Sequence, residues 1–330
     1  MINKLTRRSF AALGAAAIAT PFVARIAHAQ DPIKLRFSAV FSEQDIRAEM
    51  MKKFVEGIGP SFAYEGFYGG TLFKQGTELV ALQRGNLEMS NIAPQDVSNQ
   101  IPAWSALTSG YLFRDSAHLT KFFASDAGAE MKKLAEDQLG IKILGPTFYG
   151  TRQVGLNNDK KISTPADMAG IKLRMPGGEA WQFLGQALGA NPTPMAYAEV
   201  YTGLQTGAID GQDNPLPNVE NMKFYEVMKQ IVMTSHLVAF DLLTMSGKVW
   251  EGLPDDQKAA VQKAADEAIA FSTAAHVARE EELAKSFAER GLQVYTPDVE
   301  AFRAHVQKAY LDSALAKDWP EGLLDRISAL

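Results

Sequence analysis

Apolar residues along this chain fall into short runs that alternate with segments of helical periodicity. Residues 33–37 predict a strand, and residues 42–57 repeat apolar side chains at helical spacing, with Ser42 as the candidate cap. The same reading predicts strands at 62–67, 87–92, 141–149, 171–175 and 208–210, and helices at 77–84, 117–138 (two helices), from 165, 179–188 and 198–205. Strands that alternate with helices predict an α/β fold with mainly parallel sheets.

Residues 255–290 form the strongest single helix prediction. Pro254 precedes the segment, Asp255 and Asp256 favour its N-terminus, and Gly291 ends it. A helix of about 35 residues is about 50 Å long at ~1.5 Å per residue, more than the width of a small domain. Because the segment lacks the sustained heptads of a coiled coil, we expect it to bridge two domains.

Length and composition are consistent with a two-domain globular protein. The chain has 330 residues, 46% hydrophobic and 22% charged, and a chain of this length usually divides into two domains. It contains no cysteine, which excludes disulfides, thiolate nucleophiles, iron–sulfur clusters and cysteine zinc sites. The formal net charge is −5, without a block of Lys and Arg in the body of the chain. We therefore expect no nucleic-acid partner.

Residues 1–29 are predicted to be a cleaved export signal. A basic start precedes the apolar run 10–24, and Ala27-His28-Ala29 matches a small-residue cleavage site. The run is shorter than the ~20 apolar residues that span a bilayer, so we expect no permanent anchor. Residues 6–10 resemble the twin-arginine motif, and the general secretion route is the alternative. Either route predicts a protein that works outside the cytoplasm, with 29 Lys and Arg against 38 Asp and Glu after cleavage.

Motifs of catalysis are missing from the sequence. The histidines are scattered without metal-ligand spacing, and no G-x-S-x-G, P-loop or G-x-G-x-x-G motif is present. We therefore expect no metal, no cofactor and no catalytic residues, which favours a binding protein. An exported α/β enzyme, such as a hydrolase of small acids, is the alternative, and a His–carboxylate–Ser cluster in a cleft would support it.

Arg174 is the strongest candidate for binding an anion. It lies at the end of the predicted strand 171–175, on the face opposite to the apolar side chains, before the turn at Pro176-Gly177-Gly178. A guanidinium matches a carboxylate with paired donors, and the helix start that follows offers free N–H groups. The sequence therefore predicts a carboxylate site at Arg174, with a structural salt bridge as the alternative.

Several ordered stretches carry a resemblance to a known family. They are Gly150–Gln153, Gly170–Pro176, Asn191–Gln212, Asn214–Leu216 and Lys223–Val227. These stretches resemble the solute-binding proteins of tripartite ATP-independent periplasmic (TRAP) transporters, the DctP-like family. The strands and helices before them and the long helix after them also fit, so the resemblance covers nearly the whole mature chain.

The resemblance implies a fold, a partner and a location. The fold is a two-lobe periplasmic-binding-protein-like fold (type II) with a long domain-bridging helix. Lobe I would hold 31–149 and about 240–279, and lobe II about 150–239 and 280–330, with hinges near 149–153 and 237–242. The lobes would close on an organic-acid anion in the periplasm. Small and large integral-membrane TRAP subunits would then drive its uptake with an ion gradient, while this protein is not itself embedded in the membrane.

The resemblance also implies a set of substrate-binding residues. They are Arg174 as the carboxylate clamp, Arg152 as a second ligand contact, Asn214 as a binding-site amide, Tyr197 as a flanking aromatic residue, and Trp181 and Glu179 at the start of a helix that faces the pocket. Other roles stay open: Arg152 as a structural residue, Asn214 as a turn residue and Tyr197 as a core residue.

Departures from the family limit the identity of the ligand. Asp213 stands where many members have Glu, and Val40, Lys74 and Gln75 differ from the matching positions of sialic-acid binders. These differences argue against sialic acid. The sequence leaves open a dicarboxylate, a sugar acid, a 2-oxo acid, an aromatic acid or a sulfonate. A ligand-presenting subunit of a sensor kinase would use the same binding chemistry.

Overall fold

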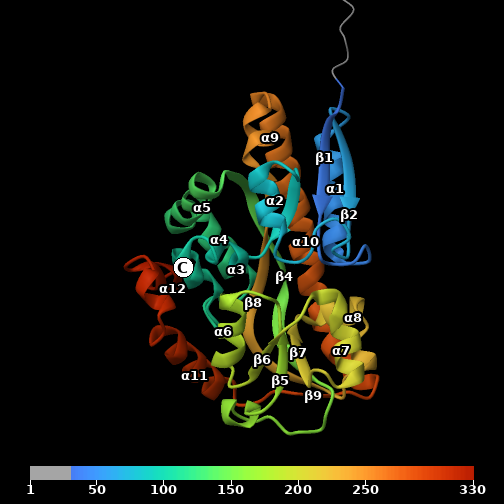
Figure 1. Cartoon of the computed structure of the whole chain (residues 1–330), viewed down its shortest axis with the longest axis vertical. Helices are drawn as coiled ribbons and strands as arrows, with labels where there is room; N and C mark the ends of the chain where they lie inside the picture. The colour runs from blue at the N-terminus through green and yellow to red at the C-terminus, as the bar shows by residue number, and fades with distance from the viewer. Residues whose placement is uncertain (1–30) are drawn as a thin grey trace, which may run out of the picture. The chain divides into compact units, whose positions relative to one another are not determined.

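Two long antiparallel strands form the centre of the structure, which is a computed structural model that describes residues 31–330. They are β4 (Ile141–Leu156) and β8 (Gln230–Ser246), and Figure 1 shows them side by side along the long axis. Their pairing shifts register at three places, including Phe148/Gly150 and Arg152/Val154, so both strands are irregular near their midpoints. The predicted export signal at 1–29 lies outside the described residues.

The other strands extend the sheet on both sides of this pair. They are β1 (Ile33–Ser38), β2 (Phe62–Phe67), β3 (Met89–Ile92), β5 (Lys172–Met175), β6 (Asn191–Pro194), β7 (Gly211–Asn214) and β9 (Gln293–Tyr295). The order is β2-β1-β3-β8-β4-β7-β5-β6, and β9 also pairs with β8. The expectation of mainly parallel sheets is wrong in the centre, where β3/β8, β4/β8 and β4/β7 are antiparallel. Local alternation of strand and helix cannot reveal how strands far apart in the sequence pair.

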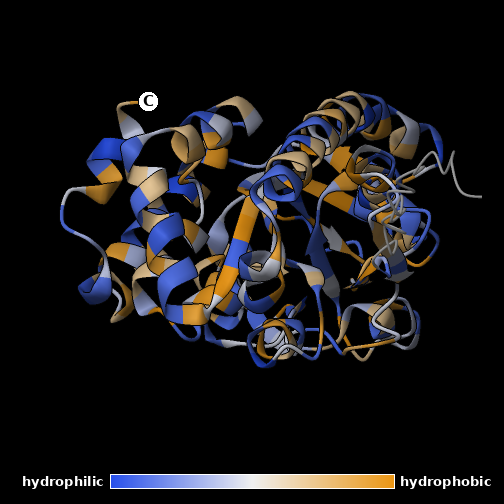
Figure 2. Cartoon of the chain, turned by 90° about the horizontal axis from the view of Figure 1, so that it is seen from above, coloured by the Kyte–Doolittle hydropathy of each residue, from blue (hydrophilic) through white to orange (hydrophobic). Residues whose placement is uncertain are grey.

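Helices cover both faces of the sheet, and Figure 2 shows hydrophobic central strands beside helices that alternate hydrophobic and hydrophilic residues. The α-helices are α1 (Ile46–Ile58), α2 (Glu78–Arg84), α3 (Pro94–Ser98), α4 (Ser116–Ala124), α5 (Asp126–Leu139), α6 (Glu179–Ala187), α7 (Val200–Thr206), α8 (Leu216–Asn221), α9 (Gly247–Gly252), α10 (Asp255–Glu289), α11 (Val299–Leu311) and α12 (Leu323–Ser328). The 3₁₀ helices are Pro102–Thr108, Pro165–Met168, Tyr197–Glu199, Phe224–Glu226 and Leu315–Asp318. On the described residues, no helix has the length and apolarity that a membrane span requires.

The long helix α10 confirms the prediction for residues 255–290 and contacts elements on both sides of the sheet centre. It packs against α1 and β4, and further along against α8 and β9. A Cβ on Gly57 of α1 would lie 2.7 Å from the Cβ of Ala264, so the absence of a side chain lets these two helices approach closely. The small buried residues of α10 therefore allow it to pack closely against α1.

The buried apolar side chains form four clusters that divide near the middle of β4 and β8. Two clusters are built mainly from residues 35–148 and 238–268, and two mainly from 154–232 and 283–310. Helix α12 packs with the first group, against α4 and α5, through Leu323 and Ile327. Residues Pro32–Leu330 form one compact unit, and the assignment of two lobes stays a prediction.

Three local boundaries differ from the predictions. Helix α1 begins after Asp45 rather than Ser42, because the Asp45 carboxylate accepts a hydrogen bond from the backbone N–H of Arg47 at 2.9 Å. Strand β4 continues seven positions beyond Tyr149, to Leu156. Strand β7 lies at Gly211–Asn214 rather than 208–210; its sequence is polar although all four residues are buried, so no apolar alternation marks it.

Candidate ligand-binding site

A cavity of about 310 Å³ lies where the midpoints of β4 and β8 meet the ends of β3, β5 and β7. The described residues bring five of the six predicted site residues to its wall: Arg174, Arg152, Asn214, Tyr197 and Trp181. Glu179 is not among the lining residues, because it lies exposed in the first turn of α6, and Gly178 lines the cavity instead. Gly178 has φ = 103°, a backbone conformation that favours glycine.

Arg174 is a buried cation without a carboxylate partner among residues 31–330. Its side chain is held by two neutral acceptors: Nε donates to the carbonyl oxygen of Met195 at 2.9 Å, and Nη2 donates to Oε1 of Gln75 at 3.2 Å. The residue is 1% exposed, and burial lowers its pKa from 12.5 to about 10. A buried charge of this kind is costly unless something pairs with it, so Arg174 is a strong anchor for an anion.

Gln75 joins the segment before α2 to the opposite wall of the cavity. Its Oε1 accepts hydrogen bonds from Arg174 and from the backbone N–H of Tyr197, the latter at 3.0 Å. On the sequence, Gln75 was notable only as a departure from sialic-acid binders. In the described structure, Gln75 is also the residue whose hydrogen bonds span the cavity.

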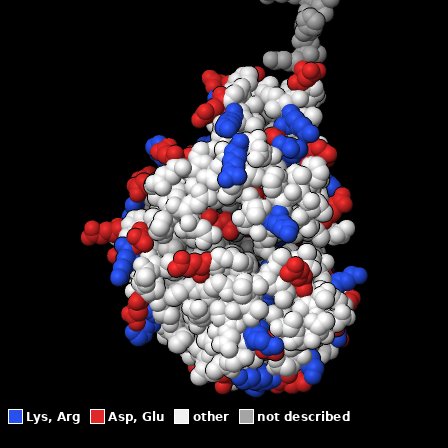
Figure 3. All heavy atoms as spheres, viewed as in Figure 1, with Lys and Arg blue, Asp and Glu red and all other residues white. Residues whose placement is uncertain are grey.

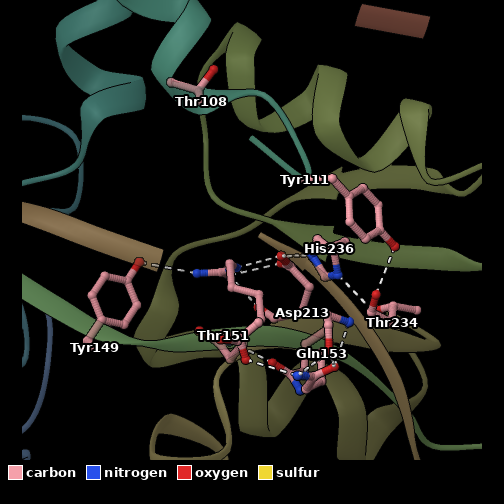
Figure 4. Close-up of polar contacts among 12 residues, drawn as sticks. Thr108, Tyr111, Tyr149, Thr151, Gln153, Asp213, Thr234 and His236 are labelled. Carbon is pink, nitrogen blue, oxygen red and sulfur yellow. Dashed lines mark hydrogen bonds and ion pairs between the residues drawn. The ribbon is translucent and has the colours of Figure 1, made fainter. Parts of the chain in front are cut away.

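Arg152 lines the same cavity, but its charge is already paired. Its Nε lies 2.6 Å from Oδ2 of Asp213, its Nη2 donates to Oδ1 at 3.0 Å and to the Asp213 carbonyl oxygen, and its Nη1 donates to the hydroxyl of Tyr149 at 3.3 Å (Figure 4). This pairing holds the pKa of Asp213 below its usual range despite burial. Arg152 also lies 4.8 Å from the ring of Trp181. Arg152 therefore has structural partners in addition to its position in the cavity wall.

Asp213 continues into a buried chain of polar groups. Its Oδ2 lies 3.2 Å from Nε2 of His236, and Nδ1 of that imidazole lies 2.8 Å from Oγ1 of Thr234 (Figure 4). Burial lowers the pKa of His236, so the imidazole is neutral at pH 7. Thr234 and His236 are 0% exposed and do not line the cavity. This carboxylate–His–hydroxyl series supports Arg152 from behind instead of facing a substrate.

Tyr197 and two asparagines form the neighbouring part of the wall. The Tyr197 hydroxyl accepts a hydrogen bond from Nδ2 of Asn218 at 3.1 Å, and Nδ2 of Asn214 donates to Oε1 of Gln212 at 2.6 Å. Asn218 is 3% exposed, and its Oδ1 is buried without a partner in the described structure. This acceptor requires a donor, which a ligand hydroxyl or a water molecule would supply.

The facing wall contains charged residues that the sequence did not single out. Arg47 lies between Asp45 and Asp241, at 2.9 Å from each, and its guanidinium stacks 4.2 Å from the ring of Phe41. Glu78 and Asp96 line the cavity nearby, and burial raises the pKa of both to about 7. Arg47, Glu78 and Asp96 lie on short or amphipathic helices, where a charged residue usually indicates a solvated face. Only the tertiary structure buries them.

Comparison with known families gives a match over most of the chain. The family model of the bacterial extracellular solute-binding proteins, family 7 (DctP), matches residues 41–317. A solved TRAP periplasmic solute-binding protein from Roseobacter denitrificans, with bound 3-deoxy-D-manno-oct-2-ulosonic acid, is 44% identical with a TM-score of 0.89. The alignment covers 91% of this chain and 99% of that one. The predicted α/β fold with a long bridging helix is therefore confirmed.

Two curated relatives have ligands of different kinds in their names. The sialic acid-binding periplasmic protein SiaP of Vibrio cholerae is 34% identical over 70% of this chain and 72% of its own length. The C4-dicarboxylate-binding periplasmic protein DctP of the same species is 30% identical over 77% of each chain. Relatives of similar identity thus have different ligands in their names.

Proposed function

This chain belongs to family 7 of the bacterial extracellular solute-binding proteins, and from this premise we propose that it captures an organic-acid anion in the Arg174 cavity and delivers it to a TRAP-type membrane transporter. The observation that carries the proposal is the Arg174 guanidinium, which is 1% exposed and has no carboxylate partner among the described residues. A carboxylate in the cavity would supply the missing charge with paired hydrogen bonds.

The other lining residues have supporting roles in this proposal. Asn214 and Tyr197 would contact the ligand beside Arg174, while Trp181 would form an apolar side of the site. Arg152 would form part of the wall mainly through its position, because Asp213 balances its charge and occupies most of its N–H groups. We assign no ligand contact to Glu179, because its side chain is exposed and outside the cavity wall.

A sugar acid is the ligand class to test first. The relative from R. denitrificans, 44% identical, holds an eight-carbon sugar acid, whereas the sialic-acid and C4-dicarboxylate binders are 34% and 30% identical. A cavity of about 310 Å³ also suits a ligand the size of a monosaccharide.

Delivery would take place in the periplasm, where small and large membrane subunits would receive the ligand and an ion gradient would drive uptake. Release requires the cavity to open, and we infer that the two predicted lobes separate by bending at the midpoints of β4 and β8. The register shifts there and the φ of 123° at Gly150 support a hinge at this place.

Catalysis of a reaction on the bound acid is the less favoured alternative. The relatives are named as binding proteins, and the Asp213–His236–Thr234 series does not reach the cavity. A hydrolase would need its nucleophile and base at the cavity wall, within reach of the substrate.

A thermal-shift screen tests the binding proposal. Sugar acids, including 3-deoxy-D-manno-oct-2-ulosonic acid, C4-dicarboxylates, sialic acid and matched uncharged sugars would each be added to the purified protein. Binding at about 100 times Kd stabilises the native state by ~2.7 kcal/mol, so a true ligand raises Tm clearly. We expect at least one acid to do so and Arg174→Ala to abolish the shift. A response to uncharged sugars alone would rule out the anion-binding proposal.

A further inference from the structure

The two walls of the cavity differ in charge. The wall built from β4, β5 and β7 contains Arg152, whose charge Asp213 balances, and Arg174, which has no carboxylate partner on the described residues. The wall built from α1, α2, α3 and β8 contains one arginine, Arg47, whose charge is shared by Asp45 and Asp241. It also contains two further carboxyl groups, which belong to Glu78 and Asp96.

Glu78 and Asp96 have no cationic partner within residues 31–330. Glu78 is 4% exposed, and its pKa is raised by burial and by the nearby charge of Asp96, although backbone N–H groups at Gly76 and Thr77 partly oppose the rise. The charged neighbour that alters the pKa of Asp96 is Asp241, which also raises it. One buried carboxyl group (Glu78) and one partly exposed carboxyl group (Asp96) without a compensating charge cost folding free energy, and such unfavourable placements are concentrated at binding sites.

We propose that Glu78 and Asp96 form a subsite that binds the hydroxyl groups of a sugar acid and excludes a second carboxylate, so that the ligand is a polyhydroxylated monocarboxylate. The inference rests on the proposed function and specifies its substrate class. The single carboxylate pairs with Arg174 on one wall, and the uncharged hydroxylated part of the ligand lies against the acidic wall.

Unpartnered acceptors in the same cavity support this assignment independently. Oδ1 of Asn218 and Oδ1 of Asn91 are both buried without a hydrogen-bond donor in the described structure, and both residues line the cavity. A hydroxyl group both donates and accepts, so a polyol segment satisfies these atoms, whereas a carboxylate only accepts.

A second carboxylate on the ligand is disfavoured at this wall. Placed at the acidic wall, it adds a like charge beside Glu78, Asp96 and Asp241. Like charges that are juxtaposed at an interface discriminate strongly against the wrong partner. The subsite therefore separates an aldonate from the aldarate of the same carbon chain, because these differ only in a terminal CH₂OH or COO⁻ group.

Matched ligand pairs and isosteric variants test the inference by calorimetry at pH 7.5. The panel holds D-gluconate and D-glucarate, D-galactonate and galactarate, succinate, and 3-deoxy-D-manno-oct-2-ulosonic acid. The proteins are the full chain, Asp96→Asn and Glu78→Gln. Asp137→Asn is the matched control, because Asp137 forms an exposed pair with Lys133 on α5. Competition against the best monocarboxylate measures weak diacids, and melting temperatures check that each variant is folded.

We expect the best monocarboxylate to bind about tenfold or more tighter than any diacid. That ratio should fall at least about fivefold in Asp96→Asn, in Glu78→Gln or in both, and stay unchanged in Asp137→Asn. A diacid that binds as tightly as the best monocarboxylate overturns the inference alone, as does a ratio unchanged in both cavity variants. If no acid of the panel binds, the inference and the proposal of a sugar-acid ligand fall together.

Discussion

Gln75 and Arg174, which are 99 residues apart in the sequence, are joined by a hydrogen bond of 3.2 Å between Oε1 and Nη2. The contact links the segment before α2 to the end of β5 across the cavity. The acceptor is a neutral amide, so it orients the guanidinium without neutralising it. Gln75 thus orients the guanidinium, and the positive charge of Arg174 remains available for a ligand.

Gln75→Ala should weaken ligand binding about tenfold without lowering the stability of the free protein much. A hydrogen bond to a charged group contributes about 1.5–3 kcal/mol, and part of this is regained by water. Calorimetry with the acid found by screening measures the effect. Gln83→Ala is the matched control, because Gln83 forms an exposed amide pair with Gln100. Equal affinities for Gln75→Ala and the full chain would show that this contact does not prepare the site.

The charge of Arg174 should matter for binding and not for folding. Arg174→Ala should weaken binding by roughly 30-fold to several thousand-fold, because truncating one partner of a buried charge pair costs about 2–5 kcal/mol. Arg174→Lys should rescue only partly, since an ammonium lacks the planar fork. The Tm of ligand-free Arg174→Leu should be unchanged or higher. Binding by Arg174→Ala within about threefold of the full chain would exclude Arg174 as the clamp.

Arg152, in contrast to Arg174, should matter for the stability of the ligand-free protein. Arg152→Leu leaves the buried Asp213 carboxylate with His236 as its remaining side-chain contact, and breaking a buried ion pair costs about 3–5 kcal/mol. Urea unfolding without ligand should therefore show a large loss of stability for Arg152→Leu and little or none for Arg174→Leu. If the two variants are equally stable, the Asp213 pair contributes less than its burial indicates.

Ligand should close the protein if the β4 and β8 midpoints act as hinges. Small-angle scattering should show a smaller radius of gyration at saturating acid than without ligand. Gly150→Ala should reduce the difference, because its φ of 123° strains any other residue and a Cβ there would lie 2.5 Å from Pro215. Identical curves with and without ligand for the full chain would contradict hinge closure.

Sequence reasoning succeeded where local signals mark an element. The elements β1, β2 and α10 were predicted nearly to their ends, α10 from its flanking Pro254 and Gly291, whereas the helix pair over 117–138 was predicted without the boundary between α4 and α5. Strand β7 was misplaced because its buried residues are polar and include Asp213. For β8, only a crossing segment near 237–242 was predicted, since Thr234 and His236 interrupt its apolar run. Strands whose buried residues include polar side chains therefore escape a search for hydrophobic alternation.

The residues of the candidate site also differ in whether a local sequence pattern predicts them. Arg174 could be predicted because it ends a strand before a Gly-Gly turn, a context in which the backbone alone places a cation at a sheet edge. Arg47 and Asp96 lie on helices whose solvent faces normally contain such residues, and their burial depends on contacts made far along the chain, such as the ion pair from Arg47 to Asp241. No local pattern contains that information.

The carboxyl of Asp96 should make the stability of the free protein depend on pH. Its pKa rises from 3.8 to about 7 in the folded protein because of burial and the charge of Asp241. Between about pH 4 and pH 7 the folded state then binds more protons than the unfolded state, so the free energy of unfolding falls as pH rises through this range. Glu78, whose pKa is also raised to about 7, acts in the same direction.

Asp96→Asn should remove part of this dependence. At pH 8 the variant should be more stable than the full chain, on the order of 2 kcal/mol, since one pKa unit corresponds to about 1.4 kcal/mol and partial solvation reduces the effect. Below about pH 3 the two proteins should be equally stable, because the carboxyl is then neutral in both states. Thermal unfolding at several pH values measures the difference, with Asp137→Asn as the exposed control. A constant difference between the full chain and Asp96→Asn from pH 4 to pH 8 would show that Asp96 does not titrate near neutrality.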